Sequence, residues 1–172
     1  MITLPGAPAL IAHLGMQRIP HEGAWFAPTY RSAETVAGEA ASPVTGEHRV
    51  CSAIYGVVTR EDFSALHRLA SDELWHFYGG DPLEMLLLHP DGRGESVVLG
   101  PDILAGQRPQ FLVPRGVWQG TRPTGTGPEA YAFIGTTVAP GFEYSDYEPG
   151  DRAGLQARYP AWADAIGRLT RP

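Results

Sequence analysis

One histidine and one glutamate near the middle of the chain have the types and the spacing to do chemistry together. His67 lies in the run Phe63–Leu69, and Glu73 opens the run Glu73–Tyr78 after a link of only Ala70-Ser71-Asp72. Both runs have the composition of β-strands, and a hairpin of the two would turn the ring nitrogen and the carboxylate toward one interior. Such a pair can ligate a metal ion or share a proton.

Three neighbours of this pair bear on its chemistry. Alternation along a strand puts Trp75 and Phe77 on the face of Glu73 and puts His76 on the opposite face. His76 therefore reaches the pair only if the strand is bulged or takes another register.

The composition excludes several classes of function. The sequence contains no lysine and no asparagine, so all 13 basic residues are arginine. A lysine Schiff base and a Walker A phosphate loop are therefore impossible. The net charge of −6 and the lack of a basic stripe argue against a nucleic-acid partner. Any side-chain cation that assists an anionic substrate must be an arginine, for which Arg31 is the first candidate and Arg68 the second.

The ends and the cysteine content predict a soluble cytoplasmic protein. Residues 1–14 lack a basic leader, and no stretch approaches the roughly 18 apolar residues that a membrane span needs. The single cysteine, Cys51, cannot form an internal disulfide and is expected to be a small hydrophobic residue of the fold. The sequence also lacks the serine-hydrolase elbow, the zinc-helix motif, paired cysteines and a dinucleotide-binding glycine pattern.

The elements expected to position these residues are mostly strands within one domain of 172 residues. A short helix is predicted after Pro8, and a second one over residues 160–169, where Trp162, Ile166 and Leu169 form one apolar face. Between them, eight or so short strands at roughly 8–12-residue spacing indicate a sandwich or barrel. The expected strands are 52–58, 63–69, 73–78, 83–88, 96–99, 110–113, 117–121 and 130–138.

Several polar segments are expected to lie outside this framework. Residues 32–49 are polar and aperiodic, and we predict a long loop there. His13, His48 and His89 are expected to be solvated. Asp146 and Glu148 are expected on a solvated acidic edge, with Asp151 capping a helix.

A series of sequence blocks, in order along the chain, resembles a known family. The blocks are 21–26, 29–32, 52–55, 66–68, 71–78, 99–102, 113–119 and 138–142. They are similar to the small cupin-5 family of the cupin superfamily, first catalogued as a domain of unknown function. The resemblance implies an all-β, double-stranded β-helix (jelly-roll) barrel with short terminal helices, a small-molecule pocket in the barrel mouth and a homodimer. The single cupin domain would span residues 1–172, with edge strands in 1–50, the barrel core in about 51–145 and a C-terminal helix in about 150–170.

The chain departs from the metal-binding cupin pattern in two places. Leu69 stands in the His-x-His slot, and Gln119 stands where the second motif carries histidine. The remaining set of His67, Glu73, His76 and Gln119 would hold a divalent ion weakly, because an amide is a poor ligand for metals that prefer imidazole. No organic cofactor is expected.

The leading hypothesis is therefore a metal-free isomerase, epimerase or lyase acting on a small polar metabolite. His67 would be the base and Glu73 would orient it. The residues expected to bind substrate are Trp75, Gln119, Trp118, Arg31 and Phe77. Two alternatives remain open: a metal-dependent decarboxylase or oxygenase, and a non-catalytic binder of a carbohydrate-like or nucleotide-like ligand. A strand at about 25–30 is the expected edge for the homodimer.

Overall fold

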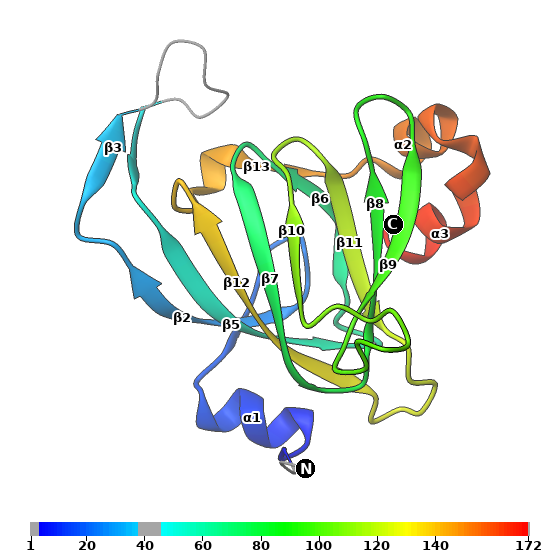
Figure 1. Cartoon of the computed structure of the whole chain (residues 1–172), viewed down its shortest axis with the longest axis horizontal. Coiled ribbons are helices and arrows are strands. Elements are labelled where there is room, and N and C mark those ends of the chain that lie inside the picture. The colour runs from blue at the N-terminus through cyan, green and yellow to red at the C-terminus, as the bar shows by residue number, and fades with distance from the viewer. Residues whose placement is uncertain (1–3, 38–45, 172) are drawn as a thin grey trace.

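Two β-sheets packed face to face form the body of the protein (Figure 1). The computed structural model describes residues 4–37 and 46–171. The six-stranded sheet has the order β1-β2-β5-β12-β7-β10, and the five-stranded sheet has the order β13-β6-β11-β8-β9. Their bounds are β1 Gln17–Arg18, β2 Trp25–Arg31, β5 Ser52–Thr59, β6 Ser64–Leu69, β7 Asp72–Gly80, β8 Leu83–Leu88, β9 Gly94–Leu99, β10 Gln110–Val113, β11 Trp118–Pro123, β12 Tyr131–Ala139 and β13 Tyr147–Pro149. Within each of these two sheets, neighbouring strands pair antiparallel, which confirms the predicted jelly-roll class.

The apolar faces of the two sheets meet in the main core. β8 contributes Leu83, Met85 and Leu87, all essentially without solvent exposure, and these pack against residues of the opposite sheet such as Val58 and Ile134. Alternation along the strands explains this, because every second side chain of a sandwich strand points inward. The strands predicted from their apolar runs are all present, with small shifts of their ends.

The helices cover outer surfaces and leave the interior to the strands (Figure 1). α1 (Ala7–His13) packs on β5 through Leu10 and Val57. The predicted C-terminal helix is divided into η2 (Pro160–Trp162) and α3 (Ala163–Arg168), and its apolar face lies in a second core beside the five-stranded sheet. A further helix, α2 (Arg152–Arg158), precedes them, so the helical region expected at about 150–170 consists of separate short helices. Asp151 caps it as expected, accepting a hydrogen bond from the Gly154 amide at 2.6 Å.

The strands that carry His67 and Glu73 do not form the predicted hairpin. β6 pairs with β11 and β13, whereas β7 pairs with β12 and β10. The chain therefore crosses from one sheet to the other at Ala70–Ser71. The hairpin prediction was wrong because a short polar link serves a sheet crossing as well as a turn, and periodicity alone does not tell the two apart. Both residues nevertheless face the space between the sheets.

The segment predicted as a long loop, 32–49, contains two short strands. β3 (Thr35–Ala37) and β4 (Glu47–Arg49) pair antiparallel as a small separate sheet, which we call the β3–β4 arm. Residues 38–45 of the predicted loop lie outside the described residues. Figure 1 shows the arm standing at the side of the barrel, at the end of β2.

Within the described part of the chain, no helix combines the length and the apolar character that crossing a membrane requires.

Candidate active site

A cavity of about 80 Å³ lies between the two sheets and contains the predicted pair. Most of its wall is apolar, and its polar groups are few and buried. We call this cavity the barrel pocket. Its lining residues are Ile19, Glu22, Ala24, Trp25, Phe26, Ile54, Gly56, Val58, His67, Leu69, Glu73, Trp75, Ile134, Thr136, Val138, Phe142, Tyr144 and Tyr147.

His67 is held by the backbone of its own strand. The residue is 3% exposed, and its Nδ1 lies 2.8 Å from the carbonyl oxygen of Ala65. A carbonyl can only accept, so Nδ1 carries the proton and, in the neutral ring, Nε2 keeps a free lone pair. Nε2 lies 4.0 Å from Oε2 of Glu22. The base predicted from the sequence is therefore in the pocket, but a backbone carbonyl sets its tautomer instead of Glu73.

Glu22 is a member of this site that the sequence reasoning did not assign. It lies in a tight turn in which His21 and Gly23 have φ angles of 65° and 105°. Ser64 donates a hydrogen bond to Oε1 of Glu22 at 2.6 Å, and the Arg171 guanidinium donates to the Glu22 backbone carbonyl at 3.2 Å. The φ angle of position 23 is one that residues with a side chain rarely adopt, so this turn favours glycine there. Glu22 lies in the first family-like block, 21–26, but nothing in the sequence indicates which way its side chain points.

Glu73 faces His67 from the opposite sheet and belongs to a buried polar chain. Gln119 donates to its Oε2 at 2.6 Å, and Trp75 in turn donates from Nε1 to Oε1 of Gln119 at 2.8 Å. Thr136 also hydrogen-bonds to the carboxyl group. Burial raises the pKa of Glu73, and the charge of Glu22 raises it further, while His67 lowers it. Hydrogen bonds thus link Glu73, Trp75 and Gln119, which were all predicted for the site. Gln119 itself does not line the pocket.

Tyr147 is the second unpredicted member. Its ring stacks on His67 with centroids 5.2 Å apart and an interplanar angle of 24°. Its hydroxyl is buried and has no hydrogen-bond partner among the described residues. Burial, and then the nearby charge of Glu22, raise the pKa of Tyr147 above its usual range, so the hydroxyl keeps its proton. The sequence offered no signal for it, because Tyr147 opens a strand of three residues that was not predicted.

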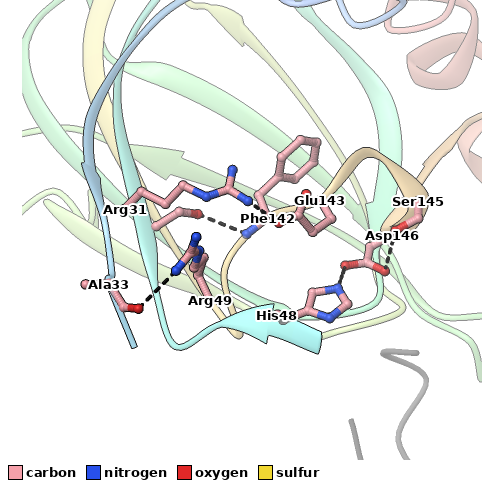
Figure 2. Close-up of polar contacts among 9 residues, drawn as sticks. Arg31, Ala33, His48, Arg49, Phe142, Glu143, Ser145 and Asp146 are labelled. Carbon is pink, nitrogen blue, oxygen red and sulfur yellow. Dashed lines mark hydrogen bonds and ion pairs between the residues drawn. The ribbon is translucent and has the colours of Figure 1, made fainter. Parts of the chain in front are cut away.

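Phe142 and Tyr144 of the segment 142–146 line the pocket, and side chains of β2 and β4 contact this segment. Figure 2 shows the contacts: His48 on β4 hydrogen-bonds to Asp146 at 2.6 Å, and Arg31 pairs with Glu143. The side chains of His48 and Asp146 are only 2% and 6% exposed. The prediction that both are solvated was therefore wrong. They were misassigned because each finds its partner 98 positions away in the sequence. Arg31 is directed to Glu143 and does not line the pocket.

Three further residues predicted for the site lie elsewhere. Trp118 belongs to the core beneath α2 and α3, with the Arg68 guanidinium 4.7 Å from its ring centroid. Phe77 packs at the margin of the main core. His76 lies on the opposite face of β7 from Glu73, where it hydrogen-bonds to Thr137 at 3.1 Å and Gln110 at 3.2 Å.

This placement separates the four groups expected to hold a metal ion. His76 points away from Glu73, as strand alternation requires, and both ends of the Gln119 amide are already engaged. In residues 4–37 and 46–171, no three His, Cys, Asp or Glu side chains cluster closely enough to form a metal centre. The donor set of a metal-dependent cupin therefore does not fit these residues.

Comparisons with known proteins agree with this architecture. A family model described as Cupin superfamily (DUF985) matches residues 8–149. A hypothetical protein from Leishmania major is similar over 98% of this chain and 100% of its own, with 29% identity and a TM-score of 0.85. A protein from Shewanella oneidensis covers 98% of this chain and 99% of its own, with 31% identity and a TM-score of 0.84.

A more distant structure shares the fold alone. The oxalate decarboxylase of Lactobacillus farciminis, determined as a formate complex, has 8% identity and a TM-score of 0.52 over 94% of this chain and 43% of its own. A search of curated proteins found no significant match.

Proposed function

The chain belongs to the cupin-5 family of the cupin superfamily, and from that premise we propose that its barrel pocket moves a proton to and from a carbon atom of a small polar metabolite. The protein would be an isomerase, an epimerase or a lyase. The observation that carries this proposal is the fixed tautomer of His67, which presents the Nε2 lone pair to a buried cavity. A neutral imidazole in that state is a general base near neutral pH.

The two carboxylates of the pocket favour the charged state that proton transfer creates. When Nε2 takes a proton from carbon, the C–H bond breaks, an N–H bond forms, and the ring becomes a cation. Glu22 lies 4.0 Å away, and Glu73 faces the same ring from the other sheet. Both lower the free energy of the imidazolium, an effect that burial strengthens. Glu73 is therefore assigned to charge stabilisation, and Ala65 takes over the orienting role.

Tyr147 is the candidate hydrogen-bond donor to the oxyanion. The electron pair released from the C–H bond moves to an adjacent carbonyl oxygen, which then needs a hydrogen-bond donor. The Tyr147 hydroxyl is protonated, buried and without a partner, and it lies on the ring that stacks against His67. Return of the proton to carbon gives an isomer, whereas departure of a group from the next carbon gives elimination.

Hydrogen exchange at carbon tests the proposal directly. Purified protein is incubated in deuterated water with a panel of small hydroxyketones and hydroxyaldehydes, and loss of carbon-bound protons is followed by NMR. We expect exchange with at least one compound, and His67→Gln should slow it by at least about a hundredfold. His76→Gln is the matched control, because His76 lies on the outer face of β7 and should leave the rate unchanged.

Other outcomes of the same experiment separate the alternatives. A compound that binds but never exchanges in the wild-type protein favours a non-catalytic binder. Exchange that survives His67→Gln refutes the assignment of the base. A stoichiometric transition metal in protein purified without chelator, lost on His67→Gln, favours metal-dependent chemistry.

The cytoplasmic location and the homodimer stay predictions. On its outer edge, β2 pairs with β1 only at Trp25 and Phe26. The remainder of that edge of β2 has no partner strand in the described structure and could pair with a second copy. Size-exclusion chromatography with light scattering tests the dimer, and a monomer at micromolar concentration counts against it.

A further inference from the structure

We propose that the barrel pocket selects uncharged or positively charged molecules rich in hydrogen-bond donors and rejects carboxylates and phosphates of the same size. This names the substrate class of the proposed site and so rests on the proposed function, but it is read from the charges of the pocket and not from its reactivity. It replaces the sequence-based idea that Arg31 clamps an anion.

The part of the pocket lining that the structure describes carries two acidic side chains, and the neutral imidazole of His67 is its one basic group. Glu22 and Glu73 are 8% and 7% exposed, and both line the cavity. No arginine is among the lining residues in the described structure, and the chain has no lysine. Arg171 is close by, but its guanidinium is bound to the backbone carbonyls of Glu22 and Phe63 and packs over the Phe63 ring.

The hydrogen-bonding groups of the pocket show the same imbalance. Nε2 of His67 is an acceptor, and both carboxylates retain lone pairs beyond the bonds they receive from Ser64, Gln119 and Thr136. Against these acceptors, the Tyr147 hydroxyl is the buried donor without a partner in the described residues. A ligand that satisfies this set must offer several N–H or O–H donors and one acceptor.

The excess of negative charge and of acceptors in the pocket matters because a ligand leaves water when it enters the cavity. A carboxylate or phosphate entering the cavity would lose its hydration and meet two buried groups of its own sign. A hydroxyl or ammonium group would instead supply the donors that the carboxylates lack. Burial is the main cause of the raised pKa of Glu73, and the negative charge of Glu22 adds to it, while His67 acts in the opposite direction.

The apolar wall completes the description of the ligand. Ile54, Val58, Ile134 and Val138 line the cavity, so most of its surface offers no polar partner. The matching molecule has one hydrocarbon face and its donors gathered at the other side.

Three probes of nearly the same size and different charge test the inference: cyclohexylmethanol, cyclohexylmethylamine in its protonated form, and cyclohexanecarboxylate. Their affinities are measured by ligand-observed NMR titration of the wild-type chain at neutral pH. We expect the alcohol and the amine to bind, and the carboxylate to bind at least about tenfold more weakly. Equal or tighter binding of the carboxylate overturns the inference, as does binding of none of the three.

Variants locate the effect in the pocket. Glu22→Gln should weaken the amine and narrow its advantage over the carboxylate, and Glu73→Gln should do the same if Glu22→Gln does not fold. Glu148→Gln is the control, because Glu148 pairs with Arg68 outside the pocket and should leave all three affinities unchanged. A control that shifts them as much as Glu22→Gln would assign the selectivity to overall charge and overturn the inference.

The two proposals fail separately. His67→Gln abolishes carbon-proton exchange under the proposed function, yet it should keep the order of the three affinities. Exchange without the expected order refutes the ligand class alone, and the expected order without exchange refutes the reaction alone.

Discussion

Replacing Gln119 by leucine should destabilise the protein strongly, although the two side chains have similar sizes. Gln119 is 1% exposed and links two other buried groups. Its amide nitrogen donates to Glu73 at 2.6 Å, and its amide oxygen accepts from Trp75 at 2.8 Å. Leucine removes both hydrogen bonds at once and leaves each partner facing an apolar side chain.

The magnitude follows from what remains unpaired. A buried neutral donor without an acceptor, here the Trp75 indole N–H, costs about 1–3 kcal/mol, and loss of a hydrogen bond to a charged group costs about 1.5–3 kcal/mol. The added apolar burial of leucine returns roughly 1–2 kcal/mol. We expect a net loss of about 3 kcal/mol in the free energy of unfolding. For a chain of this size that corresponds to a fall in Tm of roughly 6–12 °C.

Urea unfolding at neutral pH, followed by tryptophan fluorescence, measures this loss. Thr121→Val provides the matched control on the same strand. Thr121 has no solvent exposure, and its hydroxyl has no hydrogen-bond partner in the described residues, so valine should be neutral or slightly stabilising. A loss of less than about 1 kcal/mol for Gln119→Leu, or an equal loss for Thr121→Val, would refute the reasoning that the Trp75–Gln119–Glu73 chain is a satisfied polar network.

Two further predictions concern the buried carboxyl group of Glu73 and the contacts of the segment 142–146. The folded chain holds the Glu73 proton more tightly than the unfolded chain does, so the wild-type free energy of unfolding should fall as the pH rises from 4.5 through the raised pKa. Urea titrations at several pH values should show that Glu73→Gln lacks this fall, and an identical pH profile would contradict the assignment. His48→Leu should cost about 2 kcal/mol because it leaves buried Asp146 without its partner, whereas Arg31→Gln should cost less than about 1 kcal/mol because its pair with Glu143 is largely exposed. If His48→Leu and Arg31→Gln lower the Tm equally, the buried contact between His48 and Asp146 does not stabilise the protein more than the exposed ion pair does.

Local patterns were sufficient to predict the longer strands and to single out His67 and Glu73, which the structure places in one pocket. Runs such as Leu83–Leu88 are long enough and apolar enough to determine their conformation, and alternation correctly put His76 on the opposite face of β7 from Glu73. The family resemblance then supplied the way the strands associate, which the family match confirms. The course of the link between β6 and β7 could not be predicted from local patterns, because its residues suit a hairpin and a sheet crossing equally well.

The missed members of the site are those that depend on distant parts of the chain. Glu22 comes from a turn with left-handed backbone angles near the N-terminus, and Tyr147 comes from a strand of three residues. Trp118 illustrates the reverse error, since it adjoins Gln119 in sequence but its side chain belongs to another core. Adjacent residues of a strand point to opposite faces, so nearness in sequence says little about membership in a pocket.

The anchoring of Glu22 by Arg171 also has a consequence for synthesis of the protein. These residues are 149 positions apart, and between them the chain builds both sheets and brings Tyr147 onto the His67 ring. Contacts of such high sequence separation form late, after the cost of closing a long loop has been met. On the ribosome, the N-terminal turn must wait for almost the whole sequence before its anchor exists. A nascent chain of this protein can therefore hold much of its β-structure before it has a finished site.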